Sequence, residues 1–402
     1  MLKPSRTDRP AKSGRDAPLP VAVVAGLDLN GLGVVRSLAG EGVPTLVLDT
    51  GFLKPTAATR FGRRIRVPAL SGAGFIEALR SVAARFAEKP VLFLTQEGSV
   101  ETVAAALADV SASYHLTMPN LDVMKSLMNK GGFQKLAEEL NCSVPRSVRL
   151  TRDGATGVVS SLRFPCVVKP LTKEDSYSAK FKKAYKVESA DELERLWLML
   201  RDTAGEMIVQ EWIEGSDSEV YFCLQYRPRS APPVSFVGRK ICQWPPLVGG
   251  TASCAPAPEV HDELVSLTNT FFDRAGFVGL GSMEYKRDVR DNRFYMVEPT
   301  VGRTDYQEEI ATLNGVNLPY AVYCAEIGRA YRPTASVRPP RVWRDLESYR
   351  KACAAGAIDR ALEISPDAKI VDALYRANDP MPFLFMKLEP VERRLRRWYG
   401  GR

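Results

Sequence analysis

The sequence predicts a mixed α/β protein, in which an open parallel sheet near the N-terminus is followed by a region of mixed helices and strands. Two observations carry this prediction. Near the N-terminus, apolar runs that end at glycine or aspartate alternate with helical segments, as in β-α-β units. Further along, short apolar runs are separated by proline, glycine and charged turns, which is typical of antiparallel hairpins.

The first domain is expected over residues 20–120. The apolar run Pro20–Gly26 predicts a buried strand, and a glycine-containing turn, a short helix over Val34–Gly40 and a second strand over Thr45–Asp49 follow it. Three further elements complete the domain: a helix over Phe75–Ala87, a strand over Val91–Thr95 and a helix over Thr102–Asp109. This alternation predicts a doubly wound sheet.

A second domain is expected over residues 121–332. It begins with two helices, Leu121–Met128 and Gly132–Leu140, and ends in a hairpin whose strands are Gly281–Lys286 and Phe294–Glu298. We divide it into a smaller subdomain over about 121–208 and a larger one over about 209–332. Outside these domains, residues 1–19 are expected to form a disordered basic tail and residues 333–402 a largely helical extension.

Composition argues against several classes of protein. The net charge of +8 is concentrated at the ends, with +3 in residues 1–18 and +4 in residues 387–402, which leaves about +1 for the body. A nucleic-acid-binding protein would need a basic face on the fold itself, so we expect no nucleic-acid partner. The sequence holds only two histidines, which argues against a histidine-rich zinc site.

The same sequence indicates a reducing compartment. The seven cysteines include no Cys-x-x-Cys pair, and their number is odd, so we expect buried free thiols. The first twenty residues lack the apolar core of a secretory signal. The sequence contains no run of ~18 apolar residues, the length that a membrane-spanning helix needs. We therefore expect a cytoplasmic protein without a transmembrane segment.

The turn after the first strand contains Gly26, Gly31 and Gly33, and Asp49 ends the second strand. This pattern invites comparison with a dinucleotide-binding turn. The spacing differs from Gly-x-Gly-x-x-Gly, which places a pyrophosphate at a helix N-terminus. We interpret the glycines as a tight β-α turn with close packing. A nicotinamide-dependent enzyme stays open as an alternative.

A second set of residues indicates a magnesium–nucleotide site. Lys130 follows a helix, Lys169 ends an apolar strand, and lysines near a cleft bind phosphate as point charges. Glu284 and Glu298 occupy matching places on the two strands of the hairpin, where carboxylates can hold a hard cation through oxygen. The strand edge over 210–213 could offer backbone groups to a purine ring, and the acids after Gly215 could reach ribose hydroxyls.

In their order and spacing, these residues resemble the ATP-grasp superfamily, and more closely its carboxylate–amine ligase branch, from about residue 20 to residue 330. The resemblance implies the ATP-grasp fold behind an N-terminal α/β domain, with ATP and two Mg²⁺ ions, for which Mn²⁺ could substitute. By position, the family's pattern assigns Lys130 and Lys169 to phosphate and assigns Gln210, Glu211 and Ile213 to adenine. It assigns Asp217 or Glu219 to ribose, and Glu284 and Glu298 to the metal ions.

Two positions depart from the family's pattern. The third metal ligand of the family is usually an asparagine, and here Thr300 stands in its place, so one ion is expected to be held more loosely. The loop that covers the phosphates is usually rich in glycine, whereas residues 173–183 contain serines and lysines and no glycine.

The resemblance implies a reaction in which ATP activates a substrate carboxylate as an acyl phosphate and an amine then forms an amide. Three cations are assigned to the catalytic step, namely Arg239, Lys240 and Arg303. The substrates would be small or peptide-like carboxylates and amines, and a homodimer is the first candidate assembly. A catalytically impaired ATP-binding module, which Thr300 would permit, stays open.

The basic run Val391–Tyr399 allows two interpretations. It could form an amphipathic helix that docks on a partner or on an anionic membrane, or it could be a solvated helix end.

Overall fold

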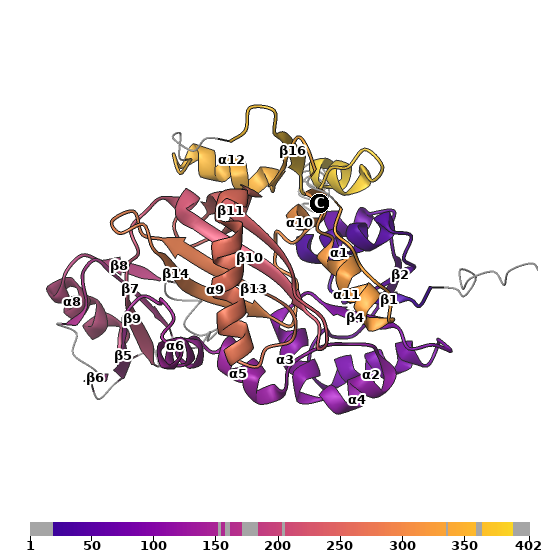
Figure 1. Ribbon diagram of the computed structural model, residues 1–402, viewed down its shortest axis with the longest axis horizontal. Helices are drawn as coiled ribbons and strands as arrows, with labels where there is room; N and C mark the ends of the chain where they lie inside the picture. The colour runs from indigo at the N-terminus through magenta and orange to yellow at the C-terminus, as the bar shows by residue number, and fades with distance from the viewer. Residues whose placement is uncertain are drawn as a thin grey trace, which may run out of the picture.

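The protein is described by a computed structural model that covers residues 19–388, apart from 152–153, 157–160, 171–183, 203–205, 335–336 and 359–363. The basic tail before residue 19, the loop over 173–183 and the basic run Val391–Tyr399 therefore lie outside the described residues. The described chain forms three β-sheets with helices packed around them (Figure 1).

The first sheet is parallel and has the strand order β3-β2-β1-β4. Its strands are β1 (Ala22–Ala25), β2 (Thr45–Asp49), β3 (Arg63–Arg66) and β4 (Val91–Leu94). Its helices are α1 (Leu29–Gly40), α2 (Gly72–Ala83), α3 (Glu97–Ala105) and α4 (Leu107–Ser113). Side chains of α1 pack on one face of the sheet, and those of α2 and α3 pack on the other. The predicted open parallel sheet with helices on both faces is confirmed.

Close packing accounts for the glycines of the β1–α1 turn. Gly26 has a φ of +97°, and a Cβ there would lie 2.4 Å from Thr95 Oγ1. A Cβ on Gly31 would lie 2.0 Å from the carbonyl oxygen of Gly26. A Cβ on Gly33 would lie 3.1 Å from the Glu309 Cβ. The turn therefore needs glycine for contacts within the protein.

A small antiparallel sheet has the order β6-β5-β9-β7-β8. It follows two helices, α5 (Leu121–Met128) and α6 (Lys130–Glu139), where two helices were predicted. The strands are β5 (Ser147–Thr151), β6 (Gly154–Thr156), β7 (Cys166–Pro170), β8 (Tyr185–Val187) and β9 (Met207–Glu211). The helix α8 (Ala190–Leu200) packs against this sheet through three leucines, Leu193, Leu196 and Leu200.

The large sheet has seven strands in the order β14-β13-β10-β11-β12-β15-β16. They are β10 (Val220–Arg227), β11 (Val234–Trp244), β12 (Gly250–Pro256), β13 (Gly279–Arg287), β14 (Phe294–Val301), β15 (Arg341–Arg344) and β16 (Lys369–Asp372). The other labelled helices are α9 (His261–Arg274), α10 (Glu309–Leu313), α11 (Leu318–Glu326) and α12 (Leu346–Ala354), and residues 381–388 are also helical. Short 3₁₀ turns are η1 (Pro55–Ala58), η3 (Asp217–Glu219) and η4 (Pro258–Val260). The helix α9 crosses one face of the sheet (Figure 1).

The chain beyond Pro333 differs from the helical extension that we expected. It contributes two strands to the edge of the large sheet, and β15 pairs with β12 through Ser253 and Cys254. Trp343 of β15 is buried beside Cys254. Each of these strands has two apolar residues between charged ones, so neither forms the apolar run that predicted the strands of the first sheet.

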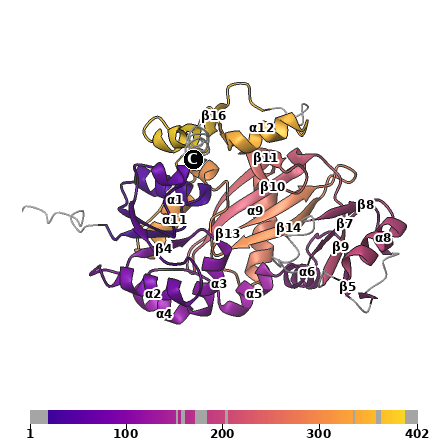
Figure 2. The ribbon, with the colours of Figure 1, turned by 180° about the vertical axis from the view of Figure 1, so that it is seen from behind.

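The core joins the N-terminal domain to the large sheet. One continuous apolar cluster contains Phe75 and Leu79 of α2 together with Phe271 and Phe272 of α9. In both views the small sheet and α8 stand at the end of the molecule opposite the parallel sheet (Figure 2). No helix in the described part of the chain is both long and apolar enough to cross a membrane.

Candidate active site

A cavity of about 420 Å³ lies between the small sheet and the large sheet. It collects residues from β7, β9, α6, β11, β13 and β14 and from the segment that follows β14. Most of the residues expected at a nucleotide site line it: Lys130, Lys169, Gln210, Glu211, Ile213, Lys240, Glu284, Glu298, Thr300 and Arg303. Segments far apart in the sequence therefore meet at one place.

Lys130 and Lys169 enter the cavity from different elements. Lys130 is the first residue of α6, and the Asn129 side chain caps this helix by accepting a hydrogen bond from the backbone N–H of Gly132, at 2.8 Å. Lys169 lies on β7, where its Nζ donates to Gln210 Oε1 on β9 at 2.9 Å. Gln210 Nε2 donates in turn to Gln134 Oε1 on α6 at 3.1 Å. The amide of Gln210 thus connects Lys169 to the helix that carries Lys130.

The strand expected to bind adenine forms one wall of the cavity. Glu211, Trp212 and Ile213 all line it. The Glu211 carboxylate accepts a hydrogen bond from the backbone N–H of Arg163 at 2.9 Å, so it holds the segment that precedes β7. The buried side chain of Ile213 adds an apolar surface against which a flat ring could pack.

Glu284 and Glu298 stand directly opposite each other on β13 and β14. The next pair on the same face is Ser282 with Thr300, and all four residues line the cavity. The alternating residues Met283 and Tyr285 are fully buried on the other face, where the Tyr285 hydroxyl lies 2.8 Å from Thr268 Oγ1 of α9. Packing against α9 thereby turns both carboxylates toward the cavity.

The donor set fits a hard cation. Two carboxylates and a threonine hydroxyl are oxygen ligands of the kind that Mg²⁺ accepts, and phosphate oxygens and water would complete the coordination shell. Among the described residues, no group of three or more histidine, cysteine or acidic side chains could hold a metal ion alone.

Two buried lysines lie beside Glu284. Lys240 Nζ contacts Glu284 Oε2 at 2.7 Å and donates to Gln243 Oε1 at 3.0 Å. Lys286 Nζ donates to the carbonyls of Gly215 at 2.8 Å and Ser216 at 2.5 Å, and burial lowers the pKa of Lys286 to about 8. The sequence argument missed Lys286, although it lies two residues after Glu284 on the same strand and could have been found from that spacing.

Three predicted site residues do not line the cavity. Asp217 is buried and accepts hydrogen bonds from the backbone N–H groups of Gln243 and Leu247, both at 2.9 Å, so it holds the loop between β11 and β12. Glu219 pairs with Arg287 Nε at 2.6 Å. Neither carboxylate lines the cavity, so the assignment of Asp217 or Glu219 to ribose stays a prediction without support from their positions.

Arg239 is the third of these residues. Its guanidinium lies over the Tyr221 ring, 5.2 Å from the ring centre, and donates to the carbonyl of Ser218 at 3.0 Å. Successive residues of a strand point to opposite faces, so only one member of the Arg239–Lys240 pair can face the cavity, and that residue is Lys240. The assignment of Arg239 to catalysis is therefore not supported by its position.

The far end of the cavity is lined by Arg303, Asp305, Tyr306 and Gln307 after β14, and by Glu97 at the start of α3. Asp305 Oδ2 accepts a hydrogen bond from Ser282 Oγ at 2.5 Å. Of these residues, only Arg303 was predicted. The others follow no recognisable spacing, and the fold alone brings them to the cavity.

Glu308 lies buried behind Asp305. Burial, with a smaller contribution from the Asp305 charge, raises the pKa of Glu308 to about 8. One of its carboxyl oxygens, Oε1, has no hydrogen-bond partner among the described residues. Glu308 is therefore protonated at neutral pH.

The sequence matches no protein-family model and no curated protein. The fold is similar to that of solved enzymes. The ADP complex of N5-carboxyaminoimidazole ribonucleotide synthetase has a TM-score of 0.64 at 14% identity, over 84% of this chain and 85% of that one. Biotin carboxylase from Campylobacter jejuni, solved with an ATP analogue, has a TM-score of 0.61 at 13% identity, over 78% of this chain and 72% of that one.

A third structure is similar as well. It is the biotin carboxylase domain of 2-oxoglutarate carboxylase from Hydrogenobacter thermophilus, a dimer with MgADP, ADP and bicarbonate. Its TM-score is 0.59 at 13% identity, over 79% of this chain and 71% of that one. This chain has the ATP-grasp fold. The fold expected from the resemblance in sequence is confirmed.

Besides Thr300, one further feature of the candidate site bears on cation binding. The carboxylate of Glu284 is paired with Lys240, whose side chain is only 4% exposed and so cannot turn out into water. An ammonium group fixed beside a carboxylate would repel a cation at the same place. Both features would weaken the binding of a cation at Glu284.

Proposed function

We propose that the protein is an ATP-dependent ligase that activates a substrate carboxylate as an acyl phosphate and joins it to an amine. The observation that carries this proposal is the meeting of Lys130, Lys169, Glu284 and Glu298 in one cavity of an ATP-grasp fold. The two lysines match a polyphosphate, and the two carboxylates match the cation that accompanies it.

In this proposal the nucleotide lies along the cavity. Its adenine ring packs against Ile213 and the edge of β9, and its phosphates lie between Lys130 and Lys169. The Asn129 cap and the bridge through Gln210 fix the two lysines before the nucleotide binds. Fixed cations of this kind stabilise the charge of the transferred phosphoryl group without reorganising during the reaction.

Mg²⁺, or Mn²⁺ in its place, would be held by Glu284, Glu298 and more weakly by Thr300, and would neutralise charge on the β- and γ-phosphate oxygens. Lys240 contacts Glu284 and supplies a further positive charge from the protein. Arg303 lines the cavity beyond β14, where its guanidinium could bind phosphate or carboxylate oxygens in pairs.

The proposed reaction has two steps. A carboxylate oxygen attacks the γ-phosphorus, the bond to the bridging oxygen breaks, and ADP leaves. The amine nitrogen then attacks the acyl carbon, phosphate leaves with the electrons of the carbon–oxygen bond, and the nitrogen loses a proton to the departing phosphate. The products are an amide, ADP and phosphate.

Hydroxylamine offers a direct test, because it traps an acyl phosphate as a hydroxamate before any particular amine is known. We expect incubation with ATP, Mg²⁺, hydroxylamine and a panel of carboxylates to release ADP and form a hydroxamate with at least one acid. Glu298→Ala should abolish both products, and Arg239→Ala, on the far face of β11, serves as the matched control. Absence of both products across a broad panel, or full activity in Glu298→Ala, would count against the proposal.

A second candidate is an ATP-binding module with little or no turnover. It is favoured by Thr300 and by the ion pair between Lys240 and Glu284, both of which weaken cation binding. Under this alternative the protein would bind MgATP and release no ADP with any acid. A binding measurement run beside the hydroxamate assay separates the two candidates.

A further inference from the structure

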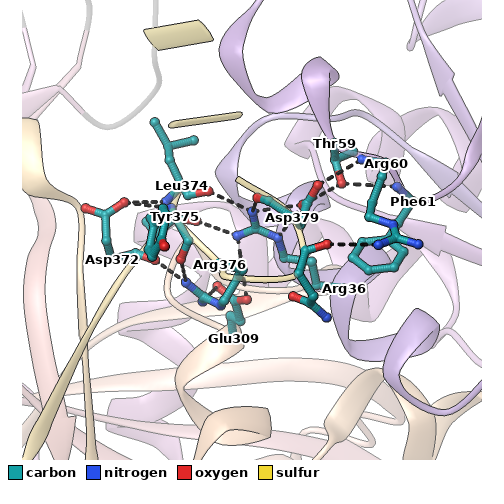
Figure 3. Close-up of polar contacts among 12 residues, drawn as sticks. Arg36, Thr59, Arg60, Phe61, Glu309, Asp372, Leu374, Tyr375, Arg376 and Asp379 are labelled. Atoms are coloured by element: carbon teal, nitrogen blue, oxygen red, sulfur yellow. Dashed lines mark hydrogen bonds and ion pairs between the residues drawn. The ribbon is translucent and has the colours of Figure 1, made fainter. Parts of the chain in front are cut away.

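The C-terminal segment is fastened to the N-terminal domain by buried charged groups (Figure 3). Arg36 of α1 donates through Nε to Asp379 Oδ2 at 3.0 Å, and its other nitrogens donate to the carbonyls of Ala373 at 2.8 Å and Leu374 at 2.7 Å. Asp379 is fully buried, and it also accepts from Thr59 Oγ1 at 2.7 Å and from the backbone N–H of Arg60 at 2.8 Å.

A second ion pair holds the same segment from the other side. Arg376 Nη2 lies 2.6 Å from Glu309 Oε2 of α10. The segment over 372–379 is therefore fixed between α1 and α10 (Figure 3). The helix that follows it, over residues 381–388, starts two residues after the anchored Asp379 and so has a defined position.

This helix has apolar residues on all sides. Pro382 faces inward and is buried, and Phe385 and Met386 are half-buried. On the outer side, Met381 is 49% exposed, Leu384 is 45% exposed and Leu388 is 62% exposed. Their spacing of three and four residues places them in one stripe along the helix. A helix that is apolar all round is normally buried, but no described residue covers this outer stripe.

The sequence at and beyond the end of this helix is strongly basic. Lys387 lies at its edge, and the sequence beyond residue 388 adds Arg393, Arg394, Arg396, Arg397 and Arg402 against Glu389 and Glu392. The same stretch contains Trp398 and Tyr399, the residue types that favour the boundary between lipid and water. Only the composition of that stretch enters here, because it lies beyond the described residues.

We propose that the outer stripe of Met381, Leu384 and Leu388 docks the protein on an anionic phospholipid surface. The helix would lie in the plane of the surface, with the stripe at the boundary of headgroups and acyl chains and Lys387 among the headgroups. A net charge of +4 over residues 387–402 favours an anionic surface, since each basic residue near such a surface raises binding roughly fivefold. This pairing of charge with apolar residues selects lipid over a neutral protein partner.

Co-sedimentation of the full-length protein with vesicles tests the proposal. We expect the protein to bind vesicles that contain phosphatidylglycerol and to stay in solution with vesicles of phosphatidylcholine alone. Leu384→Asp/Leu388→Asp should lower binding at least tenfold. Replacing the four arginines from Arg393 to Arg397 with glutamine should lower vesicle binding by a similar factor. High salt should also lower vesicle binding, because it screens the charges.

The matched control places two aspartates at an exposed apolar pair elsewhere. Leu198→Asp/Met199→Asp changes α8, at the opposite end of the molecule, and should bind as the unchanged protein does. Melting curves show whether each variant folds, and the arginine variant tests the charge outside the described fold. Equal binding to neutral and anionic vesicles, or no binding, would overturn the proposal. So would a stripe variant that turns a dimer into a monomer yet still binds the vesicles, since the stripe would then be a subunit interface.

Discussion

The buried Lys240 and the half-buried Glu284 form an ion pair in the candidate site. Sequence reasoning assigned Glu284 to the metal ions and Lys240 to the catalytic step. It did not predict that they contact each other, since their strands are separated by β10 in the sheet. It also could not tell which of Arg239 and Lys240 faces the cavity, because packing in the folded protein decides which face of a strand each residue occupies.

In the proposed function, Lys240 would compete with a cation for Glu284. We expect Lys240→Met to tighten the binding of Mn²⁺ to the nucleotide-free protein about tenfold or more, because a fixed positive charge is removed from its immediate surroundings. Turnover should fall in the same variant, because the positive charge beside the transferred phosphoryl group is lost. Titration of free Mn²⁺ by electron paramagnetic resonance measures the first effect. Arg239→Met should leave Mn²⁺ affinity unchanged, and a looser Mn²⁺ site in Lys240→Met would contradict the account.

Glu308 should make stability depend on pH. In the folded protein it keeps its proton up to about pH 8, whereas the unfolded chain releases that proton near 4.5. Between these values the folded state binds more protons than the unfolded state, so stability falls as the pH rises. We expect the free energy of unfolding to drop between pH 5 and pH 8 by on the order of 2 kcal/mol more in the unchanged protein than in Glu308→Gln. Urea denaturation at both pH values measures this, with Glu139→Gln as an exposed control, and parallel pH profiles would disprove the assignment.

At the scale of elements, the predictions succeeded where apolar runs are long or a family pattern sets the spacing. The strands β1, β2 and β4 read as continuous apolar runs, because a parallel sheet buries both faces. The strands β15 and β16 gave no such signal, since each has only two apolar residues between charged ones and is held at the sheet edge by contacts with distant segments. Local sequence does not encode those contacts.

The start of α6 couples an element to the site. Asn129 caps the helix, and Lys130 is its first residue. We expect Asn129→Ala to cost about 1 kcal/mol of stability and to weaken MgATP binding, because the first turn that positions Lys130 frays. Asn129→Asp keeps a capping oxygen and should preserve both properties. Urea denaturation and calorimetric titration of nucleotide measure the two effects, and unchanged affinity in Asn129→Ala would show that the cap does not position Lys130.

On the scale of the whole molecule, the C-terminal segment closes the structure by joining the N-terminal domain to α10. Arg36 and Asp379 are separated by more than three hundred residues, yet both are buried in one contact. Pairing over such a distance depends on the complete fold, which is why the sequence suggested only a helical extension there.

Breaking this contact should loosen the C-terminal segment. We expect Asp379→Ala to destabilise the protein by about 3–5 kcal/mol, because Arg36 stays buried without its partner. The double variant Arg36→Met/Asp379→Leu should recover much of that loss. Limited proteolysis should cleave the segment that follows Asp372 faster in Asp379→Ala than in the unchanged protein. A single variant as stable as the unchanged protein would show that the buried pair does not fasten the segment.

The proposed ligase activity requires a nucleotide that binds together with a metal ion held by Glu284 and Glu298. Calorimetric titration with a non-hydrolysable ATP analogue, with Mg²⁺ or with a chelator, measures this most directly. We predict tight binding with Mg²⁺, weak binding with the chelator, and loss of the Mg²⁺ effect in Glu284→Gln and Glu298→Gln. Equal affinity with and without Mg²⁺, or tight binding of NADH with none of the ATP analogue, would contradict the account.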